Sequence, residues 1–113
     1  MLNVTNDNRD TVFVDLDGCL VWHQYDPESI PDVSIDSLIA FIQSNRSRLY
    51  VIVTTSRSLS HANLALEVLS KKGFIPDGVI HSLPTGKRIV INDHKEGESN
   101  KSVAINLVRN HGI

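Results

Sequence analysis

The chain has 113 residues, of which 41% are hydrophobic and 21% charged, and its formal net charge is −2. This length suits one domain with one core, so we treat residues 1–113 as a single domain. The near-neutral charge gives no basis for binding nucleic acid along its length. The single cysteine, Cys19, excludes an intramolecular disulfide. No apolar run reaches the roughly 20 residues of a membrane span, and the polar N-terminus lacks the pattern of a secretory signal, so we expect a cytoplasmic protein without membrane contact.

The first half of the chain alternates between strand and helix patterns. Residues 12–14 form a short β-rich run that stops at Asp17-Gly18, which predicts a buried strand and a turn. Residues 21–33 contain two prolines and no helical period, which indicates a loop or short hairpin. Apolar residues then recur at helical spacing over 35–42, with Ser34 as the expected N-cap. A second strand is expected over residues 49–53.

The second half repeats this alternation. Apolar side chains at 62, 65, 66 and 69 predict a second helix, capped by Ser58 or Ser60 and ended by Gly73. Further strands are expected over residues 78–80 and 88–91. For residues 103–108 we favour an edge strand over a short helix. Strands alternating with helices predict an α/β fold, with a mainly parallel sheet covered on both faces.

Polar residues follow the predicted strands where ligands bind in such sheets, at the carboxyl ends. The first strand ends in Asp15-Leu16-Asp17, the second in residues 54–57, and the fourth in Asn92-Asp93, with Lys87 just before it. Two carboxylates about 4 Å apart repel by ~4 kcal/mol at an effective dielectric near 20. A divalent cation offsets this repulsion, and aspartate oxygens suit Mg²⁺. The pattern therefore predicts a site for Mg²⁺ and a phosphoryl group.

These segments resemble the haloacid dehalogenase (HAD) superfamily. Residues 12–20, VFVDLDGCL, are similar to its first motif, an apolar strand followed by Asp-x-Asp-Gly. Residues 53–57, VTTSR, are similar to the second motif, and residues 89–93, IVIND, to the acidic fourth motif. Lys87 is the candidate for the third-motif lysine, with Lys95 as its rival. The resemblance covers residues 11–95 and implies a Rossmann-like three-layer sandwich without a cap domain.

The resemblance also implies roles for individual residues. Asp15 corresponds to the nucleophile and metal ligand. Asp17 corresponds to the general acid and base, whose main-chain carbonyl also contacts the metal. The phosphate-binding group corresponds to Thr55, Ser56, Arg57 and Lys87. Asp93 is the expected fourth-motif metal ligand, although Asn92 stands where a second acid is frequent and remains an alternative.

The expected activity is Mg²⁺-dependent hydrolysis of a phosphomonoester through an aspartyl phosphate, with a small sugar phosphate as one candidate substrate. A phosphorylated nucleic-acid end is the one nucleic-acid substrate left open. Two alternatives remain: a receiver-like signalling domain, and a catalytically weak binding module with the HAD fold. Because no cap covers the expected site, we also predict a homo-oligomer in which the 21–33 loop, with Trp22, Tyr25 and Ile30, meets a partner.

Overall fold

The computed structural model describes residues 7–24 and 33–113. Its elements, in chain order, are β1 (Asp10–Asp15), α1 (Asp36–Ser44), the short 3-10 turn η1 (Arg46–Arg48), β2 (Leu49–Thr54), α2 (Leu59–Ser70) and β3 (Gly78–Ile80). The three strands form one parallel sheet in the order β1-β2-β3. An α/β fold with a parallel sheet is therefore confirmed, as are the positions of these three strands and two helices.

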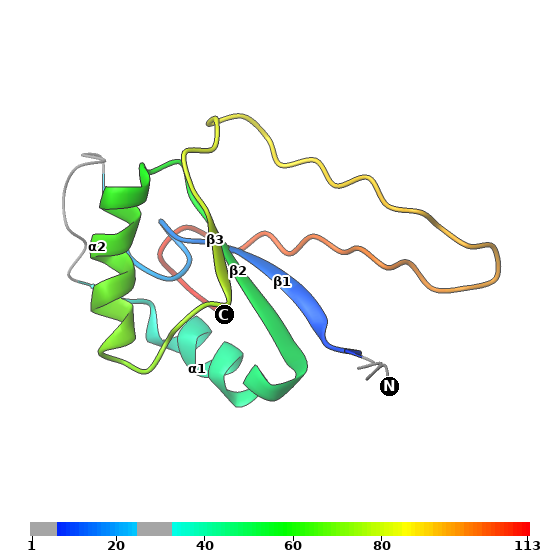
Figure 1. Ribbon diagram of the computed structural model, residues 1–113, viewed down its shortest axis with the longest axis horizontal. Helices are drawn as coiled ribbons and strands as arrows, with labels where there is room; N and C mark the ends of the chain where they lie inside the picture. Colours follow the sequence, from blue (N-terminus) through cyan, green and yellow to red (C-terminus); the bar gives the residue numbers. More distant parts are fainter. Residues whose placement is uncertain (1–6, 25–32) are drawn as a thin grey trace, which may run out of the picture.

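Both helices lie on the same side of the sheet (Figure 1). The two crossovers, β1 to β2 and β2 to β3, step across the sheet in the same direction. Since parallel crossovers are right-handed, two steps in one direction place both helices on one face. The described elements therefore make two layers, and the second face of the sheet carries no helix of the described residues.

The core lies between the sheet and the two helices. Val12 pairs with Val51 and Val14 with Val53 in the register of β1 and β2, so these side chains share the helix-covered face. The buried residues of this core are Val14, Leu16, Leu20, Val21, Ile35, Leu38, Ile39, Ile42, Val51, Val53, Ala62, Ala65, Leu69 and Phe74. On the other face, Phe13 is 60% exposed and Ile80 42% exposed. That face is apolar and open to solvent.

The helix ends agree with the sequence in part. Ser58 caps α2, where its hydroxyl accepts a hydrogen bond from the His61 N–H at 3.4 Å, and Gly73 has the positive φ of +84° expected after a helix. The prediction of Ser34 as the cap of α1 is wrong. The N-cap position is Ile35, which has no side-chain cap, and the Ser34 hydroxyl instead donates to Asp36 at 2.6 Å.

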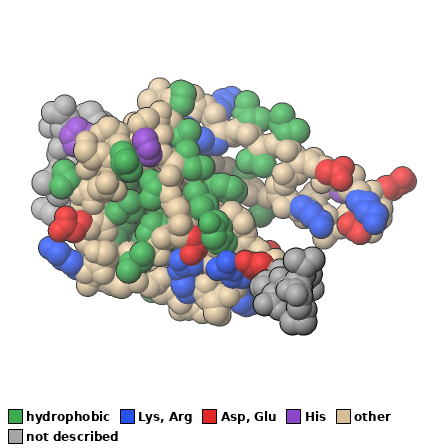
Figure 2. All heavy atoms as spheres, in the orientation of Figure 1, with side chains coloured by type: hydrophobic (Ala, Val, Ile, Leu, Met, Phe, Trp, Pro, Cys, Tyr) green, Lys and Arg blue, Asp and Glu red, His purple; other side chains and the backbone are tan. Residues whose placement is uncertain are grey.

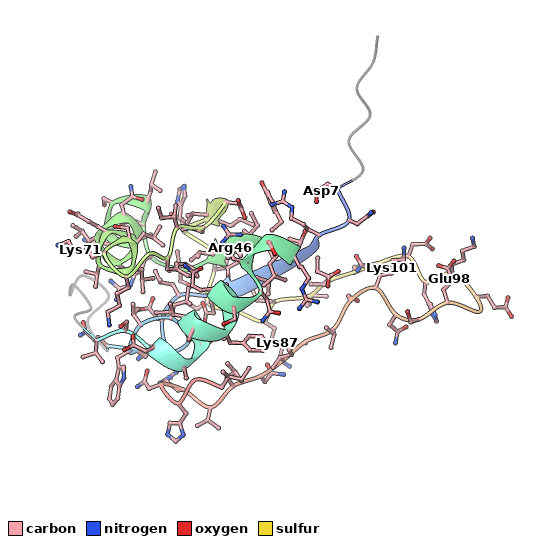
Figure 3. The ribbon with its side chains drawn as sticks, turned by 90° about the horizontal axis from the view of Figure 1, so that it is seen from below. Asp7, Arg46, Lys71, Lys87, Glu98 and Lys101 are labelled. Atoms are coloured by element: carbon pink, nitrogen blue, oxygen red, sulfur yellow. The ribbon has the colours of Figure 1, made fainter. Side chains whose placement is uncertain are left out.

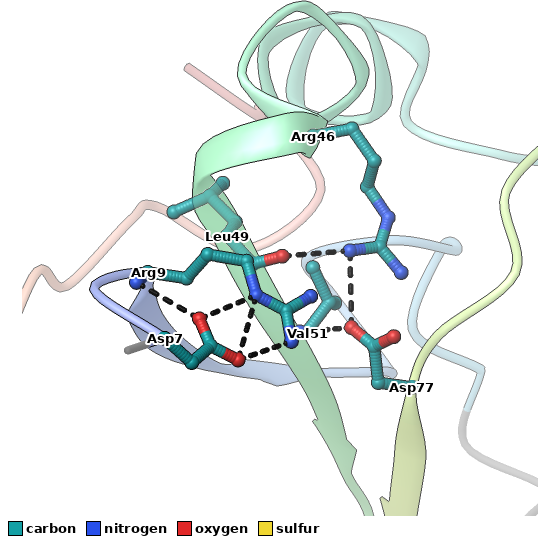
Figure 4. A network of polar contacts seen from close by, with 6 residues as sticks. All are labelled: Asp7, Arg9, Arg46, Leu49, Val51 and Asp77. Carbon is teal, nitrogen blue, oxygen red and sulfur yellow. Dashed lines mark hydrogen bonds and ion pairs between the residues drawn. The ribbon is translucent and has the colours of Figure 1, made fainter. Parts of the chain in front are cut away.

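A set of charged side chains fixes the amino ends of the strands (Figure 4). Asp77 accepts a hydrogen bond from the Val51 N–H at 2.7 Å and pairs with Arg46 at 3.0 Å. These two contacts, the first the larger, hold the pKa of Asp77 below its ordinary value. Nearby, the Arg9 guanidinium binds Asp7 and lowers the pKa of that carboxyl to about 2. These contacts lie at the end of the sheet opposite the predicted site.

Residues 84–106, which we call the arm, extend away from the body as two legs without helix or strand (Figure 1). The predicted strand over 88–91 is therefore wrong, as is the predicted strand or helix over 103–108. The physical reason for the first is connection length. Only residues 81–87 separate β3 from Arg88, whereas a parallel crossover needs a dozen residues or more.

Two other expectations concern the surface and the loop after β1. Across residues 7–24 and 33–113, every helix is too short or too polar to cross a lipid bilayer. Most of the predicted 21–33 loop, including Tyr25 and Ile30, lies outside the described residues. Trp22 is described and is 48% exposed.

Candidate functional site

The Asp15–Asp17 segment leads from β1 into a tight turn. The Leu16 N–H donates to the Thr54 carbonyl at 3.0 Å, and the Gly18 N–H donates to the Val21 carbonyl at 2.7 Å. Gly18 has a φ of +86°, a backbone conformation that side chains with a Cβ rarely adopt. Leu16, Leu20 and Val21 are fully buried beneath the turn. This packing explains why apolar residues alternate with the aspartates: the leucines anchor the turn and leave the carboxylates at the surface.

The end of β2 forms the neighbouring wall. Thr55 is almost fully buried, and its hydroxyl accepts a hydrogen bond from the Arg57 N–H at 3.0 Å. The chain after β3 ties this turn in place, because the Leu83 N–H donates to the Thr55 carbonyl at 3.1 Å and the Ser82 N–H donates to the Arg57 carbonyl at 2.8 Å. These three hydrogen bonds fix the turn that follows β2.

Arg57 reaches across to the first turn and binds Asp17. Its Nε donates to Oδ2 at 2.9 Å and its Nη2 donates to Oδ1 at 2.9 Å, a two-point contact with the carboxylate. The Arg57 side chain is 4% exposed and that of Asp17 is 21% exposed. The resemblance implied that Arg57 binds phosphate, whereas in this structure the Arg57 guanidinium binds and orients the carboxylate of Asp17.

Asp15 lies on the open face of the sheet at the end of β1. Its side chain reaches solvent, but the protein around it removes part of its hydration, and this desolvation is the main cause that raises its pKa. The negative charge of Asp17 raises the pKa further, whereas Arg88, the Leu16 N–H and His23 act in the opposite direction. The two aspartates are therefore close enough to interact, and Arg88 is the nearby cation.

The remaining predicted residues are not gathered at this end of the sheet. Lys87 is exposed and lies toward the body end of the arm, whereas Glu98 and Lys101 lie near its far end (Figure 3). Lys95 pairs with Glu98 at 3.7 Å. Asn92 and Asp93 are exposed on the arm, and Ser56 is exposed on the turn after β2. The structure thus brings together Asp15, Asp17, Thr55 and Arg57, but not Lys87, Asn92 or Asp93.

The C-terminal residues contact the aspartate turn, a feature that the sequence analysis missed. The Asn110 N–H donates to the Gly18 carbonyl at 2.9 Å, and the Asn110 side-chain oxygen accepts from the His23 N–H at 2.7 Å. Arg109 packs so close to Gly18 that a Cβ there would meet its Cγ at 3.3 Å. The one available signal was weak: Asn110 has a φ of 66°, which asparagine tolerates better than most residues.

The donor atoms that the turn presents suit a hard cation in part. Mg²⁺ is commonly held by one or two carboxylates together with waters and the phosphate oxygens of the substrate. The Asp15 carboxylate, which reaches solvent, is a donor of this kind, and the resemblance implies the main-chain carbonyl of Asp17 as a second. Within residues 7–24 and 33–113, no three Asp, Glu, His or Cys residues gather as a metal-binding group. A cation at this turn would therefore need ligands from water or from a bound phosphate in addition to Asp15.

Comparison of the chain with protein-family models, with curated proteins and with solved structures finds no match. The functional interpretation therefore depends on the residues of this chain and their geometry.

Proposed function

We propose that this chain is a Mg²⁺-dependent phosphohydrolase of the HAD kind, which acts on a phosphomonoester through an aspartyl phosphate. The observation that supports the proposal is the meeting of Asp15 and Asp17, on one turn, with Thr55 and Arg57, on the next strand end. Two carboxylates beside a buried hydroxyl and a guanidinium supply a nucleophile, a proton carrier and hydrogen-bond donors within one small surface.

The proposed chemistry assigns one task to each aspartate. An oxygen of Asp15 attacks phosphorus, so that a new O–P bond forms as the bond to the leaving oxygen breaks. Asp17 gives a proton to the leaving oxygen and later takes one from the water that hydrolyses the aspartyl phosphate. Arg57 is a positioning residue that holds Asp17 in place. Bound Mg²⁺ supplies positive charge against the repulsion between phosphate and carboxylates.

The finer fold assignment belongs to the same proposal. A Rossmann-like three-layer sandwich requires a layer on the second face of the sheet, where Phe13 and Ile80 are exposed. A cytoplasmic location and the absence of a cap domain likewise remain predictions from the sequence.

The test is a phosphate-release assay, with and without Mg²⁺, on sugar phosphates, nucleotides and 3′-phosphorylated DNA. On any active substrate, Asp15→Asn should lower turnover by at least about a thousandfold, because an amide cannot form the acyl phosphate. Asp10→Asn is the matched control, since it makes the same change at the opposite end of β1. Equal rates for wild type and Asp15→Asn would contradict the covalent mechanism.

A second candidate is a phosphate-binding module without turnover. Both oxygens of Asp17 are engaged by Arg57, and Asp93 lies away on the arm, which favours binding over catalysis. Calorimetric binding of a phosphomonoester by a chain that releases no phosphate would support this candidate. A receiver-like domain is less well supported, because β3 is followed by His81 and offers no carboxylate acceptor.

A further inference from the structure

The edge of β1 that faces away from β2 is the first of two segments whose strand-forming backbone lacks a partner. Among the described residues β1 pairs only with β2, which leaves the backbone of Asp10–Asp15 without a ladder on its other side. Proteins usually blunt such an edge with charged side chains, proline or a bulge. Between the aspartates at its two ends, the β1 sequence DTVFVD carries no charge and no proline, and Phe13 stands 60% exposed on the open face of the sheet.

The arm is the second segment whose backbone is largely unpaired. Within residues 84–106 the one backbone–backbone hydrogen bond joins the Glu98 N–H to the Lys95 carbonyl. Its β-prone aliphatic side chains are exposed: Ile89 80%, Val90 64%, Ile91 91%, Val103 87% and Ile105 75%. These hydrophobic side chains lie on the part of the arm nearer the body, and charged side chains gather at its far end (Figure 2). Contiguous exposed apolar surface of this kind marks an interaction site.

The arm does not reach the β1 edge of its own chain as a parallel strand. Residues 81–87 are too short for the crossover that would carry the chain from β3 to the start of a strand beside β1. Arg88, at the start of the apolar run, acts on the charge of Asp15 at the carboxyl end of β1, and the arm leads away from the body (Figure 1). Within one chain only an antiparallel approach is open to the arm, whereas an arm from another molecule can approach the β1 edge in either direction.

We propose that two copies of this chain form a dimer by arm exchange, in which residues 88–91 of each copy add a strand to the free edge of β1 in the other. The free edge of β1 and the unpaired arm occur in the same chain. In a dimer with a two-fold axis, the arm of each copy can therefore pair with the β1 edge of the other. The new ladder pairs the backbone of both segments, and Ile89, Val90 or Ile91 covers Phe13. Charge favours the pairing in either strand direction, because β1 begins with Asp10 and ends with Asp15, whereas Lys87 and Arg88 precede the apolar run.

The central experiment mixes two single-cysteine chains in a Cys19→Ala background. One chain carries Phe13→Cys, and the other carries a cysteine at position 89, 90 or 91. Disulfide formation between them gives a covalent heterodimer on a non-reducing gel, which an arm folded onto its own chain does not produce. Since alternate residues of a strand point to opposite faces, we expect cross-linking at 90 alone, or at 89 and 91 but not 90.

The oligomeric state provides the second measurement. Light scattering should give a dimer mass for the wild-type chain and a monomer mass for Ile89→Lys with Ile91→Lys, because lysine opposes both burial and edge pairing. Ser99→Lys, on the exposed outer part of the arm, is the matched control and should stay dimeric. A wild-type monomer overturns the proposal. A dimer that cross-links equally at 89, 90 and 91, or at none of them, overturns strand exchange.

Discussion

Arg57 donates hydrogen bonds to both carboxylate oxygens of Asp17 across a separation of 40 residues in sequence. The contact joins the turn after β1 to the turn after β2, so it fixes the two walls of the candidate site relative to each other. The Arg57 side chain is 4% exposed and that of Asp17 21% exposed, so water screens this interaction less than it screens a surface ion pair.

Arg57→Lys should lower the free energy of unfolding by about 1–3 kcal/mol, because lysine keeps the charge but lacks the planar fork. Urea denaturation measures this. Arg9→Lys is the matched control, since Arg9 also pairs with an aspartate but at the surface, and its effect should be much smaller than that of Arg57→Lys. Similar losses for the two variants would show that the Arg57 contact has no special role in the fold.

Asp77 should make stability depend on pH. The Val51 N–H and Arg46 lower the pKa of the Asp77 carboxyl from its ordinary value of 3.8, because both bind its ionised form in the folded state. Ionised Asp77 therefore stabilises the fold. That contribution is complete above the ordinary pKa and disappears as pH falls through the lowered one. Asp77→Asn should therefore be less stable than wild type at neutral pH, and the two should converge in acid. Thermal unfolding across this pH range tests it, with Asp93→Asn on the arm as control; a constant gap down to the most acid pH would contradict the assignment.

Asn110 should stabilise the aspartate turn from the far end of the chain. Asn110→Ala removes the acceptor of the His23 N–H and places alanine at a φ of 66°, which together should cost about 2 kcal/mol. Asn110→Gly removes the side chain without the backbone strain and should cost about half of that. Amide hydrogen exchange gives a local readout: in both variants the His23 amide should exchange faster. Unchanged exchange there would mean that the tail does not hold the turn.

The elements predicted correctly from the sequence are those with a local signal. The helical spacing of Leu38, Ile39 and Ile42 and the β-rich run ending at Val53 each specify one element and its buried face. Asp15 and Thr55 could be placed at one edge because parallel strands end together. The same local logic failed at Ile89–Ile91, where the β-rich run is real but the preceding connection is too short for a parallel strand.

The site contacts that the sequence did not reveal are long-range. Neither the Arg57–Asp17 pair nor the Asn110–His23 contact has a pattern in sequence, because each joins residues that are far apart along the chain. The strand order decides which face of the sheet the helices cover and which stays open. The alternation of strands and helices along the sequence does not determine that order. Three layers were expected, and the described elements form two.

Asp93 links the proposed arm exchange to the proposed hydrolysis. If residues 88–91 of one copy run parallel to β1 of the other, Asp93 arrives at the carboxyl end of that strand, beside Asp15 and Asp17. Asp15→Asn and Asp93→Ala should then each lose phosphatase activity alone. A mixture that has exchanged subunits should regain on the order of one quarter of wild-type activity, because half of the dimers are mixed and each mixed dimer has one intact site. A mixture as inactive as its components would show that Asp93 does not act across the dimer. Full activity of Asp93→Ala alone would show that the reaction does not need it, and the cross-links would still decide whether the arms exchange.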